Sequence, residues 1–266
     1  MGAGRQHRVG LGRHDPRIRN HGRVRLVARQ SVPVTREPGA QALWLELPPI
    51  SADAPKRLLV FLHGAGSSAE RFAPIAISWL LKFPGATGAI LHALRPSGAG
   101  SGGDWFDSLG TAETLAPRVQ AAGRQVAQRI EALQHASGLG GRDTVVIGFS
   151  QGATLALEVA RSRPDLLGIA VSYSGRMIPP PRNGEPPGPA IHLLHGELDS
   201  VVPVIHSQQA HRRLAANGTH VTLDILEEHG HSIGQDMIIL GTTRVMQTLF
   251  RHRRPQPKPS VRPVLH

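Results

Sequence analysis

The chain contains no cysteine. Disulfide bonds, thiolate metal sites and cysteine nucleophiles are therefore excluded. It also has no apolar run close to the roughly 20 residues that a membrane-spanning helix needs. Aromatic residues make up only 4% of the composition, and they do not alternate with basic residues. Nucleic-acid binding is consequently not expected.

Acidic residues are scarce at the two ends of the chain and nowhere else. The formal net charge is +11, but residues 1–29 hold eight Arg against one Asp, and residues 251–266 hold four Arg, one Lys and no acid. The sequence predicts a nearly neutral folded domain over residues 40–250, between a basic N-terminal extension (1–29) and a basic, proline-rich tail (251–266). Both ends are expected to be disordered and to touch anionic surfaces weakly at most. Because residues 1–29 lack the apolar core of a secretory signal, a cytoplasmic location is expected.

Apolar, β-branched stretches alternate with helical patterns through the interior. Strands are expected at 42–47, 57–63, 89–94, 144–149, 167–171, 190–195 and 221–226. Helices are expected at 69–81, 111–136, from 151 onward, at 204–217 and up to about 250. This alternation predicts an α/β fold with a mostly parallel, doubly wound sheet and helices on both faces. At 266 residues the chain is long enough for one sizeable domain of that kind.

Residues 148–152 read GFSQG, a G-x-S-x-G pattern between an expected buried strand and an expected helix. A strand that reverses into a helix so quickly strains its middle residue, and the flanking glycines remove Cβ atoms that would clash. Ser150 is thereby exposed at the carboxyl end of the strand, with the N-terminus of a helix behind it. The context predicts a nucleophilic serine.

A serine nucleophile needs a base, and the base needs a carboxylate that fixes its tautomer and stabilises its charged form. Ligands of a parallel sheet bind beyond the carboxyl ends of the strands. Asp199 and His231 both follow predicted strands, and they give the chain order serine, acid, histidine that such sheets use. We therefore expect Ser150, Asp199 and His231 to act together.

Other histidines compete for the role of base. His195 and His206 precede the last predicted strand, so the chain order disfavours them. His229 is the serious rival, since it lies only two residues from His231. We favour His231 because Gly230 lets the backbone bring it close to the serine.

Other carboxylates compete with Asp199. Glu197 lies closer to the end of its strand, and Asp224 lies inside the last predicted strand. We favour Asp199 and keep both rivals open.

Two backbone N–H groups are expected to stabilise a developing oxyanion. One belongs to Gln151, directly after the serine, and the other is expected to be that of Ala65, in the loop that follows the first buried strand. Trp105 and Phe106 are expected either to line a substrate pocket or to pin their loop to the domain. No cofactor is implied, and no metal site is expected because the histidines lack ligand spacing.

Six blocks of sequence, taken in order, resemble one known family. They are LHGAG (62–66), WFD (105–107), GFSQGA (148–153), YSGR (173–176), HGELDSVVP (195–203) and GHSI (230–233). The set is similar to the phospholipase/carboxylesterase family of α/β hydrolases, over about residues 45–250. The resemblance implies the α/β-hydrolase fold, a catalytic triad of Ser150, Asp199 and His231, and an oxyanion hole formed by the Ala65 and Gln151 N–H groups.

The expected function is that of a serine carboxylesterase. Its expected substrates are carboxylic esters of small molecules or lipids, and thioesters are included as a further possibility. A lysophospholipase or acyl-protein thioesterase is the alternative within the family. A hydrolase-like domain that only binds a partner through its basic tails is the alternative outside enzymes. The Gly/Ser-rich loop before Trp105 and the proline-rich stretch 179–189 depart from the family pattern, so substrate preference does not carry over.

Overall fold

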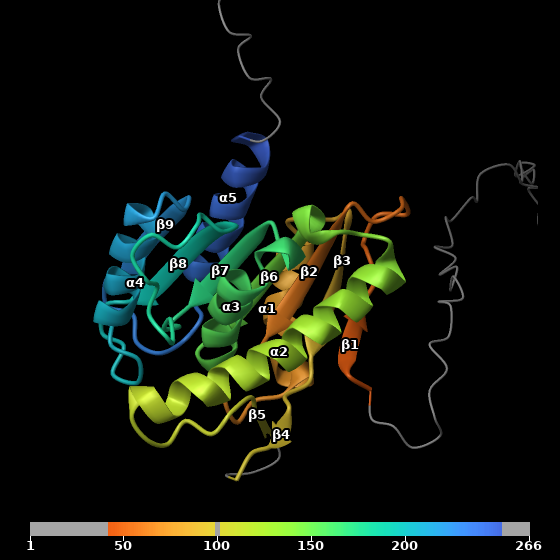
Figure 1. Cartoon of the computed structure of the whole chain (residues 1–266). Coiled ribbons are helices and arrows are strands. Elements are labelled where there is room, and N and C mark those ends of the chain that lie inside the picture. Colours follow the sequence, from red (N-terminus) through yellow and green to blue (C-terminus); the bar gives the residue numbers. More distant parts are fainter. Residues whose placement is uncertain (1–41, 99–101, 252–266) are drawn as a thin grey trace, which may run out of the picture. The chain divides into compact units, whose positions relative to one another are not determined.

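The structure is a computed structural model, and it describes residues 42–98 and 102–251. The N-terminal extension predicted at 1–29 and the tail beyond Arg251 lie outside the described residues. Seven strands form one sheet in the order β1-β3-β2-β6-β7-β8-β9 (Figure 1). They are β1 (Trp44–Leu47), β2 (Arg57–Leu62), β3 (Ala86–Leu91), β6 (Thr144–Phe149), β7 (Ile169–Tyr173), β8 (Ala190–Gly196) and β9 (Val221–Leu226).

Five α-helices are described: α1 (Ala69–Leu80), α2 (Ala112–Ser137), α3 (Gln151–Ser162), α4 (Ile205–Ala216) and α5 (Gln235–Arg251). Two short strands, β4 (Arg95–Pro96) and β5 (Gly103–Asp104), pair as a separate ribbon. The 3₁₀ turns η1 (Gly141–Asp143) and η2 (Pro164–Leu166) precede β6 and β7.

The sheet is parallel except for β1, which pairs with β3 in the antiparallel sense at one edge. The predicted doubly wound, mostly parallel architecture is therefore confirmed. Because the parallel strands run in one direction, the segments that follow β2, β6, β7, β8 and β9 all start at the end of the sheet where these strands finish, here called its carboxyl edge. Ligand sites of such sheets lie at that edge.

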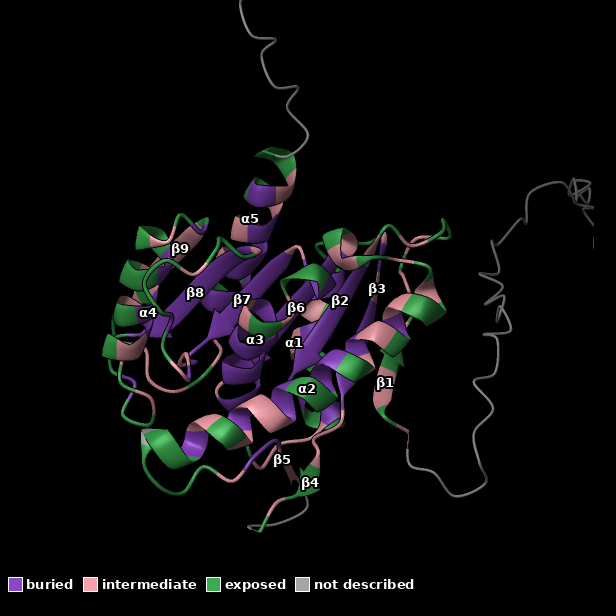
Figure 2. Ribbon diagram, in the orientation of Figure 1, coloured by how far each residue is buried: buried purple, intermediate pink, exposed green. Residues whose placement is uncertain are grey.

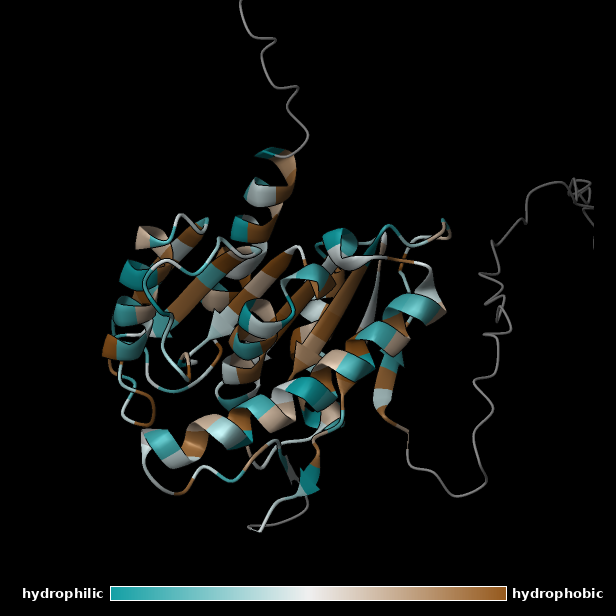
Figure 3. Ribbon diagram, viewed as in Figure 1, coloured by the Kyte–Doolittle hydropathy of each residue, from teal (hydrophilic) through white to brown (hydrophobic). Residues whose placement is uncertain are grey.

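Strand β2 shows how the two faces of the sheet are filled. Leu58, Val60 and Leu62 point into the core under α2, α3 and α4, whereas Leu59 and Phe61 point into the core under α1 and α5. All five are at most 1% exposed, so each stabilises the fold by about 1.5–3 kcal/mol. The central strands are buried in Figure 2, and most of their residues are hydrophobic in Figure 3.

Two strands lie elsewhere along the chain than predicted. The strand expected at 89–94 is β3, Ala86–Leu91, because Ala86 pairs with Arg57 and the ladder with β2 runs from there. The strand expected at 167–171 is β7, Ile169–Tyr173, because its last residues extend beside the end of β6. Among the described residues, no helix is long and apolar enough to cross a membrane.

Candidate active site

Ser150 forms the sharp turn between β6 and α3. Its backbone has φ 54° and ψ −115°, a conformation that residues with a side chain rarely adopt. The neighbouring glycines make the turn possible, since a Cβ on Gly148 would collide with the Gly152 carbonyl and a Cβ on Gly152 with the Leu62 carbonyl. The Ser150 N–H donates to the Tyr173 carbonyl at 2.9 Å. The turn is thus held against β7 with its hydroxyl outward.

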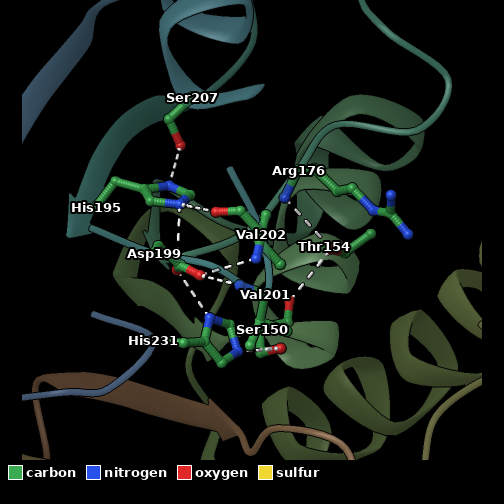
Figure 4. A network of polar contacts seen from close by, with 9 residues as sticks. All are labelled: Ser150, Thr154, Arg176, His195, Asp199, Val201, Val202, Ser207 and His231. Atoms are coloured by element: carbon green, nitrogen blue, oxygen red, sulfur yellow. Dashed lines mark hydrogen bonds and ion pairs between the residues drawn. The ribbon is translucent and has the colours of Figure 1, made fainter. Parts of the chain in front are cut away.

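His231 reaches that hydroxyl from the loop after β9. Its Nε2 lies 2.9 Å from Ser150 Oγ, and its Nδ1 lies 2.8 Å from Asp199 Oδ2 (Figure 4). A carboxylate only accepts hydrogen bonds, so Nδ1 carries the proton and Nε2 is left to accept from the serine. The Phe149 ring packs on the imidazole, with ring centroids 4.9 Å apart. The imidazole is therefore held in the tautomer and position that suit a base.

Asp199 is buried on the loop after β8, and none of its side chain is exposed. Its second oxygen, Oδ1, accepts from the N–H groups of Val201 at 3.0 Å and Val202 at 2.8 Å. Burial is the largest influence on the carboxyl and raises its pKa, but the hydrogen bonds from His231 and Val202 outweigh it, and the pKa of Asp199 is lowered. The carboxylate is thus kept charged and aimed at the histidine.

The rival residues have other partners. His229 lies 2.9 Å from the Glu227 carbonyl through Nδ1 and 2.7 Å from Asp236 through Nε2. Asp224 is paired with Arg244. Glu197 is exposed, and the carboxylate bonded to His231 is that of Asp199. None of the three rivals takes part in the hydrogen-bond chain of Ser150.

A second histidine contacts Asp199 from inside the protein. The His195 ring at the end of β8 is fully buried, with Nε2 2.7 Å from the Val202 carbonyl and 3.3 Å from Asp199 Oδ2. Its Nδ1 lies 2.7 Å from Ser207 Oγ on α4. Burial lowers the pKa of His195, which keeps the ring neutral. A carbonyl only accepts, so Nε2 carries the proton and the Ser207 hydroxyl donates to Nδ1.

Thr154 ties the serine turn to the loop after β7. One turn along α3, its hydroxyl donates to the Ser150 carbonyl at 3.2 Å and accepts from the Arg176 N–H at 3.4 Å (Figure 4). Burial lowers the pKa of Arg176. The backbone on both sides of Ser150 is therefore fixed by its neighbours.

The two N–H groups expected to bind an oxyanion lie in different segments. Gln151 is the first residue of α3, so its N–H has no partner within the helix. Ala65 is exposed in the loop after β2, and its N–H donates to none of the described residues. Both donors are therefore available to a ligand.

Trp105 and Phe106 are buried, at 2% and 5% exposed. The Trp105 indole N–H donates to the His63 carbonyl at 2.7 Å, and its ring lies 5.2 Å from the His63 ring. These contacts correspond to the second of the two expected roles, that of pinning the loop. That they line a substrate pocket stays a prediction.

Sequence reasoning missed two groups of this site. His195 was weighed as a base rather than as a partner of Asp199, although a histidine that ends a buried strand four residues before the acid is a usable signal. The side chain of Gln151, 9% exposed, was also overlooked because only its backbone was considered. Among residues 42–98 and 102–251, no group of three or more His, Cys, Asp or Glu is arranged to hold a metal ion.

Comparison with known proteins gives consistent matches. A sequence model of the phospholipase/carboxylesterase family matches residues 50–241. Esterase YpfH of Escherichia coli (strain K12) is 31% identical over 204 residues, which cover 76% of this chain and 88% of that protein. The crystal structure of esterase PE8 has a TM-score of 0.71 at 30% identity, covering 77% of this chain and 97% of that one.

A more distant structure agrees in fold. The carboxylesterase from Mesorhizobium loti has a TM-score of 0.63 at 19% identity, covering 72% of this chain and 88% of that chain. The sheet order, the strand–turn–helix around Ser150 and the family match over residues 50–241 all agree with the α/β-hydrolase fold. The chain therefore belongs to the phospholipase/carboxylesterase family and is a serine hydrolase.

Proposed function

We propose that the chain is a carboxylesterase that cleaves its substrate through an acyl-enzyme formed on Ser150. One feature carries the proposal, the hydrogen-bond chain from the Ser150 hydroxyl through His231 to Asp199, with links of 2.9 and 2.8 Å. The two histidines nearest to His231 in role, His195 and His229, have both nitrogens engaged with other protein atoms.

In the first half of the reaction, Ser150 Oγ attacks the carbonyl carbon of the ester while His231 Nε2 accepts the hydroxyl proton. The charged imidazolium is stabilised by the Asp199 carboxylate on its other side. Collapse of the tetrahedral intermediate breaks the bond to the alcohol, and His231 returns the proton to the departing oxygen. The product of this half is the acylated serine.

In the second half, a water molecule takes the place of the alcohol. His231 Nε2 removes its proton as the oxygen attacks the acyl carbon, and the proton then passes to Ser150 Oγ as the carboxylic acid leaves. In both halves the carbonyl oxygen becomes negative. The N–H groups of Ala65 and Gln151 are the donors we assign to it.

The scissile bond is that of an ester, and thioesters are the matched alternative. An alkoxide is a poor leaving group that needs the proton carried by His231, whereas a thiolate is much less basic and departs with less help. The same acyl group should therefore be tested as an alkyl ester and as a thioester. Because the thioester is intrinsically the easier substrate, the thioester-to-ester rate ratio should be compared with that of hydroxide-catalysed hydrolysis of the same pair. Only a ratio well above the uncatalysed one would favour the acyl-protein thioesterase branch of the family.

The decisive experiment measures hydrolysis of p-nitrophenyl esters from acetate to decanoate by the parent and by Ser150→Ala. We expect the substitution to reduce kcat at least about 10⁴-fold, because the nucleophile is lost while binding remains. Ser137→Ala is a matched control. The helix end that carries Ser137 bonds through Gln134 to Thr144 at the start of β6, at the opposite edge of the sheet.

The control should keep parental kcat. Turnover by Ser150→Ala equal to that of the parent would show that Ser150 is not the nucleophile and would overturn the proposal. A fluorophosphonate probe gives a second readout, since it should label the parent and the Ser137 variant but not Ser150→Ala. The chain-length profile of the parent then bounds the depth of the acyl site.

A further inference from the structure

Residues 103–106, here called the brace, connect the two loops that carry the proposed oxyanion donors. The brace begins with β5 and ends with Trp105 and Phe106, which are buried among core residues. Apolar burial alone would fix such a segment. Its polar atoms, however, are bonded to the loop after β2 and to the first residue of α3.

The first connection runs from the brace to α3. The side-chain amide of Gln151 pairs with the backbone on both sides of one peptide, since Oε1 accepts from the Trp105 N–H at 3.0 Å and Nε2 donates to the Phe106 carbonyl at 3.1 Å. Two bonds to a planar amide fix direction as well as distance. Gln151, whose N–H we assign to the oxyanion, is thus also bonded to the brace through its side chain.

The second connection runs from the brace to the loop after β2. The Trp105 indole donates to the His63 carbonyl at 2.7 Å. On the other side of Ala65, the Gly66 N–H donates to the Gly103 carbonyl at 3.0 Å and to Asp104 Oδ1 at 2.9 Å. Ala65 is therefore anchored on both sides.

These anchors determine where the Ala65 N–H points. Peptide units are planar, so holding the His63 carbonyl and the Gly66 N–H leaves little freedom for the one peptide between them, Gly64–Ala65, which carries the Ala65 N–H. The Ala65 N–H itself bonds to none of the described residues. A donor that is unoccupied but held by bonded neighbours is preorganised for a ligand.

We propose that Trp105 and the side chain of Gln151 are positioning residues that fix the Ala65 and Gln151 N–H groups relative to each other. The inference rests on the proposed function, because it assigns both N–H groups to the oxyanion. Neither side chain needs to touch the substrate. The brace acts in series, so that weakening either connection loosens one donor relative to the other.

The test compares kcat and KM for Trp105→Phe, Gln151→Met and the double variant. Trp105→Phe keeps an aromatic ring and removes the indole donor, and Gln151→Met keeps the length of the side chain and the backbone N–H. Each should lower kcat about 10- to 100-fold, as expected for a donor displaced from the oxyanion, with KM changed by less than about 3-fold. The acid limb of the pH–rate profile should not move, because His231 and Asp199 are untouched.

The double variant separates a series connection from two independent effects. In a series connection, its kcat should lie within about 3-fold of the worse single variant. Independent effects would multiply instead, to a loss of about 10²- to 10⁴-fold, and would overturn the proposal. Parental kcat in both folded single variants would overturn it as well.

A matched control makes the same chemical change elsewhere. Trp79 is also fully buried, but its indole nitrogen has no hydrogen-bond partner within residues 42–98 and 102–251, and its ring lies in the core under α1 and α5. Trp79→Phe should lower stability without lowering kcat. If it lowered kcat as much as Trp105→Phe does, the effect would be a general consequence of core damage, and the proposal would be wrong.

Inhibition by an alkyl trifluoromethyl ketone gives a second readout. Ser150 adds to this ketone and produces a tetrahedral oxyanion, so its affinity should fall in each variant by about the same factor as kcat/KM. If Trp105→Phe does not fold, Gln151→Met carries this test by itself, and unchanged affinity would overturn the proposal. Failure of the proposed function is recognised separately, by undiminished turnover in Ser150→Ala.

Discussion

Two histidines share the carboxylate of Asp199, and they differ in every other respect. His231, on the loop after β9, approaches Asp199 Oδ2 at 2.8 Å, and His195, at the end of β8, approaches the same oxygen at 3.3 Å (Figure 4). The His231 side chain is 17% exposed, whereas that of His195 is not exposed at all. The far nitrogen of His231 meets the Ser150 hydroxyl, and the far nitrogen of His195 meets Ser207 on α4.

A hydrogen bond to the same acid does not by itself make a histidine a base. Both nitrogens of His195 are occupied by protein atoms, and burial lowers its pKa, so it has no route to a substrate and resists taking up a proton. His231 has one nitrogen directed at a reactive hydroxyl. We infer that strand β8 supplies a neutral scaffold and the loop after β9 supplies the chemistry.

The largest loss of activity should follow from removing His231, the histidine that is bonded to Ser150. We expect His231→Ala to lower kcat by at least about 10⁴-fold, because His231 Nε2, 2.9 Å from Ser150 Oγ, is the group that we propose takes the Ser150 proton. Steady-state hydrolysis of a p-nitrophenyl ester measures the loss. The folded state of the variant is checked by its thermal unfolding.

His229→Ala is the matched control for that variant. His229 lies two residues away and bonds to Asp236 and the Glu227 carbonyl, so its loss should leave kcat within about 3-fold of the parent. If His229→Ala were the inactive variant and His231→Ala the active one, the two loop histidines would have to exchange roles.

An intermediate effect is expected at His195. His195→Phe keeps a ring but loses both nitrogens, which releases the Val202 carbonyl and leaves the buried Ser207 hydroxyl without its partner. We expect kcat/KM to fall about 10- to 100-fold, since each stranded polar group costs about 1–3 kcal/mol and the loop that holds Asp199 loosens.

Two further variants test which hydrogen bonds of His195 matter for activity. His195→Gln can keep a donor near the Val202 carbonyl and should recover part of the lost activity. Ser207→Ala removes the bond to Nδ1 and spares the bonds of Nε2, so its loss in kcat/KM should be under about 5-fold. If His195→Phe kept parental kcat/KM, the scaffold role would be refuted.

Much of the fold could be predicted because its central strands are uninterrupted apolar runs. Strands β6 and β9 occupy the predicted residues, Thr144–Phe149 and Val221–Leu226. Strand β3 was misplaced because Ala86, Thr87 and Gly88 carry too little apolar surface to signal a strand. They belong to it through pairing with β2, and pairing between distant segments leaves no trace in local periodicity.

The end of β7 was missed for a related reason. Ser172 interrupts the apolar run, which suggested that the strand had ended. In the structure Ser172 and Tyr173 continue the ladder beside Gly148 and Phe149. The neighbouring strand therefore decided the end of β7, and it also provides the Tyr173 carbonyl that holds the Ser150 N–H.

The site divides in the same way. The sequence was enough to predict that Ser150, Asp199 and His231 lie close together. Each of them follows a recognisable strand, and the carboxyl ends of parallel strands lie at the same end of a sheet. The contact of Asp199 with His195 and the hydrogen bonds of the Gln151 side chain to the brace could not be predicted. They depend on the paths of residues 103–106 and 197–204, which have no periodic pattern to read.

The smallest effect on catalysis should come from the other buried histidine of β8. His192 bonds to Thr222 through Nδ1 at 2.9 Å and to Thr248 through Nε2 at 3.1 Å, away from the site. His192→Gln can keep polar contacts to both threonines and should leave kcat unchanged. Its effect should appear in the pH dependence of stability instead.

Burial is the main cause that lowers the pKa of His192 from its usual 6.5 to about 4. The unfolded chain therefore takes up a proton as the pH falls below 6.5, while the folded protein does not until about pH 4. The stability contributed by neutral His192 is complete above pH 6.5 and is lost as the pH falls toward 4, by about 2 kcal/mol between pH 7 and 5. Urea unfolding of the parent and of His192→Gln at both pH values measures this, and the variant should lose about 2 kcal/mol less than the parent. Equal losses of unfolding free energy in the two proteins would mean that His192 is not held neutral. His195 would then be the one histidine of β8 to which a structural role as a neutral ring could be assigned.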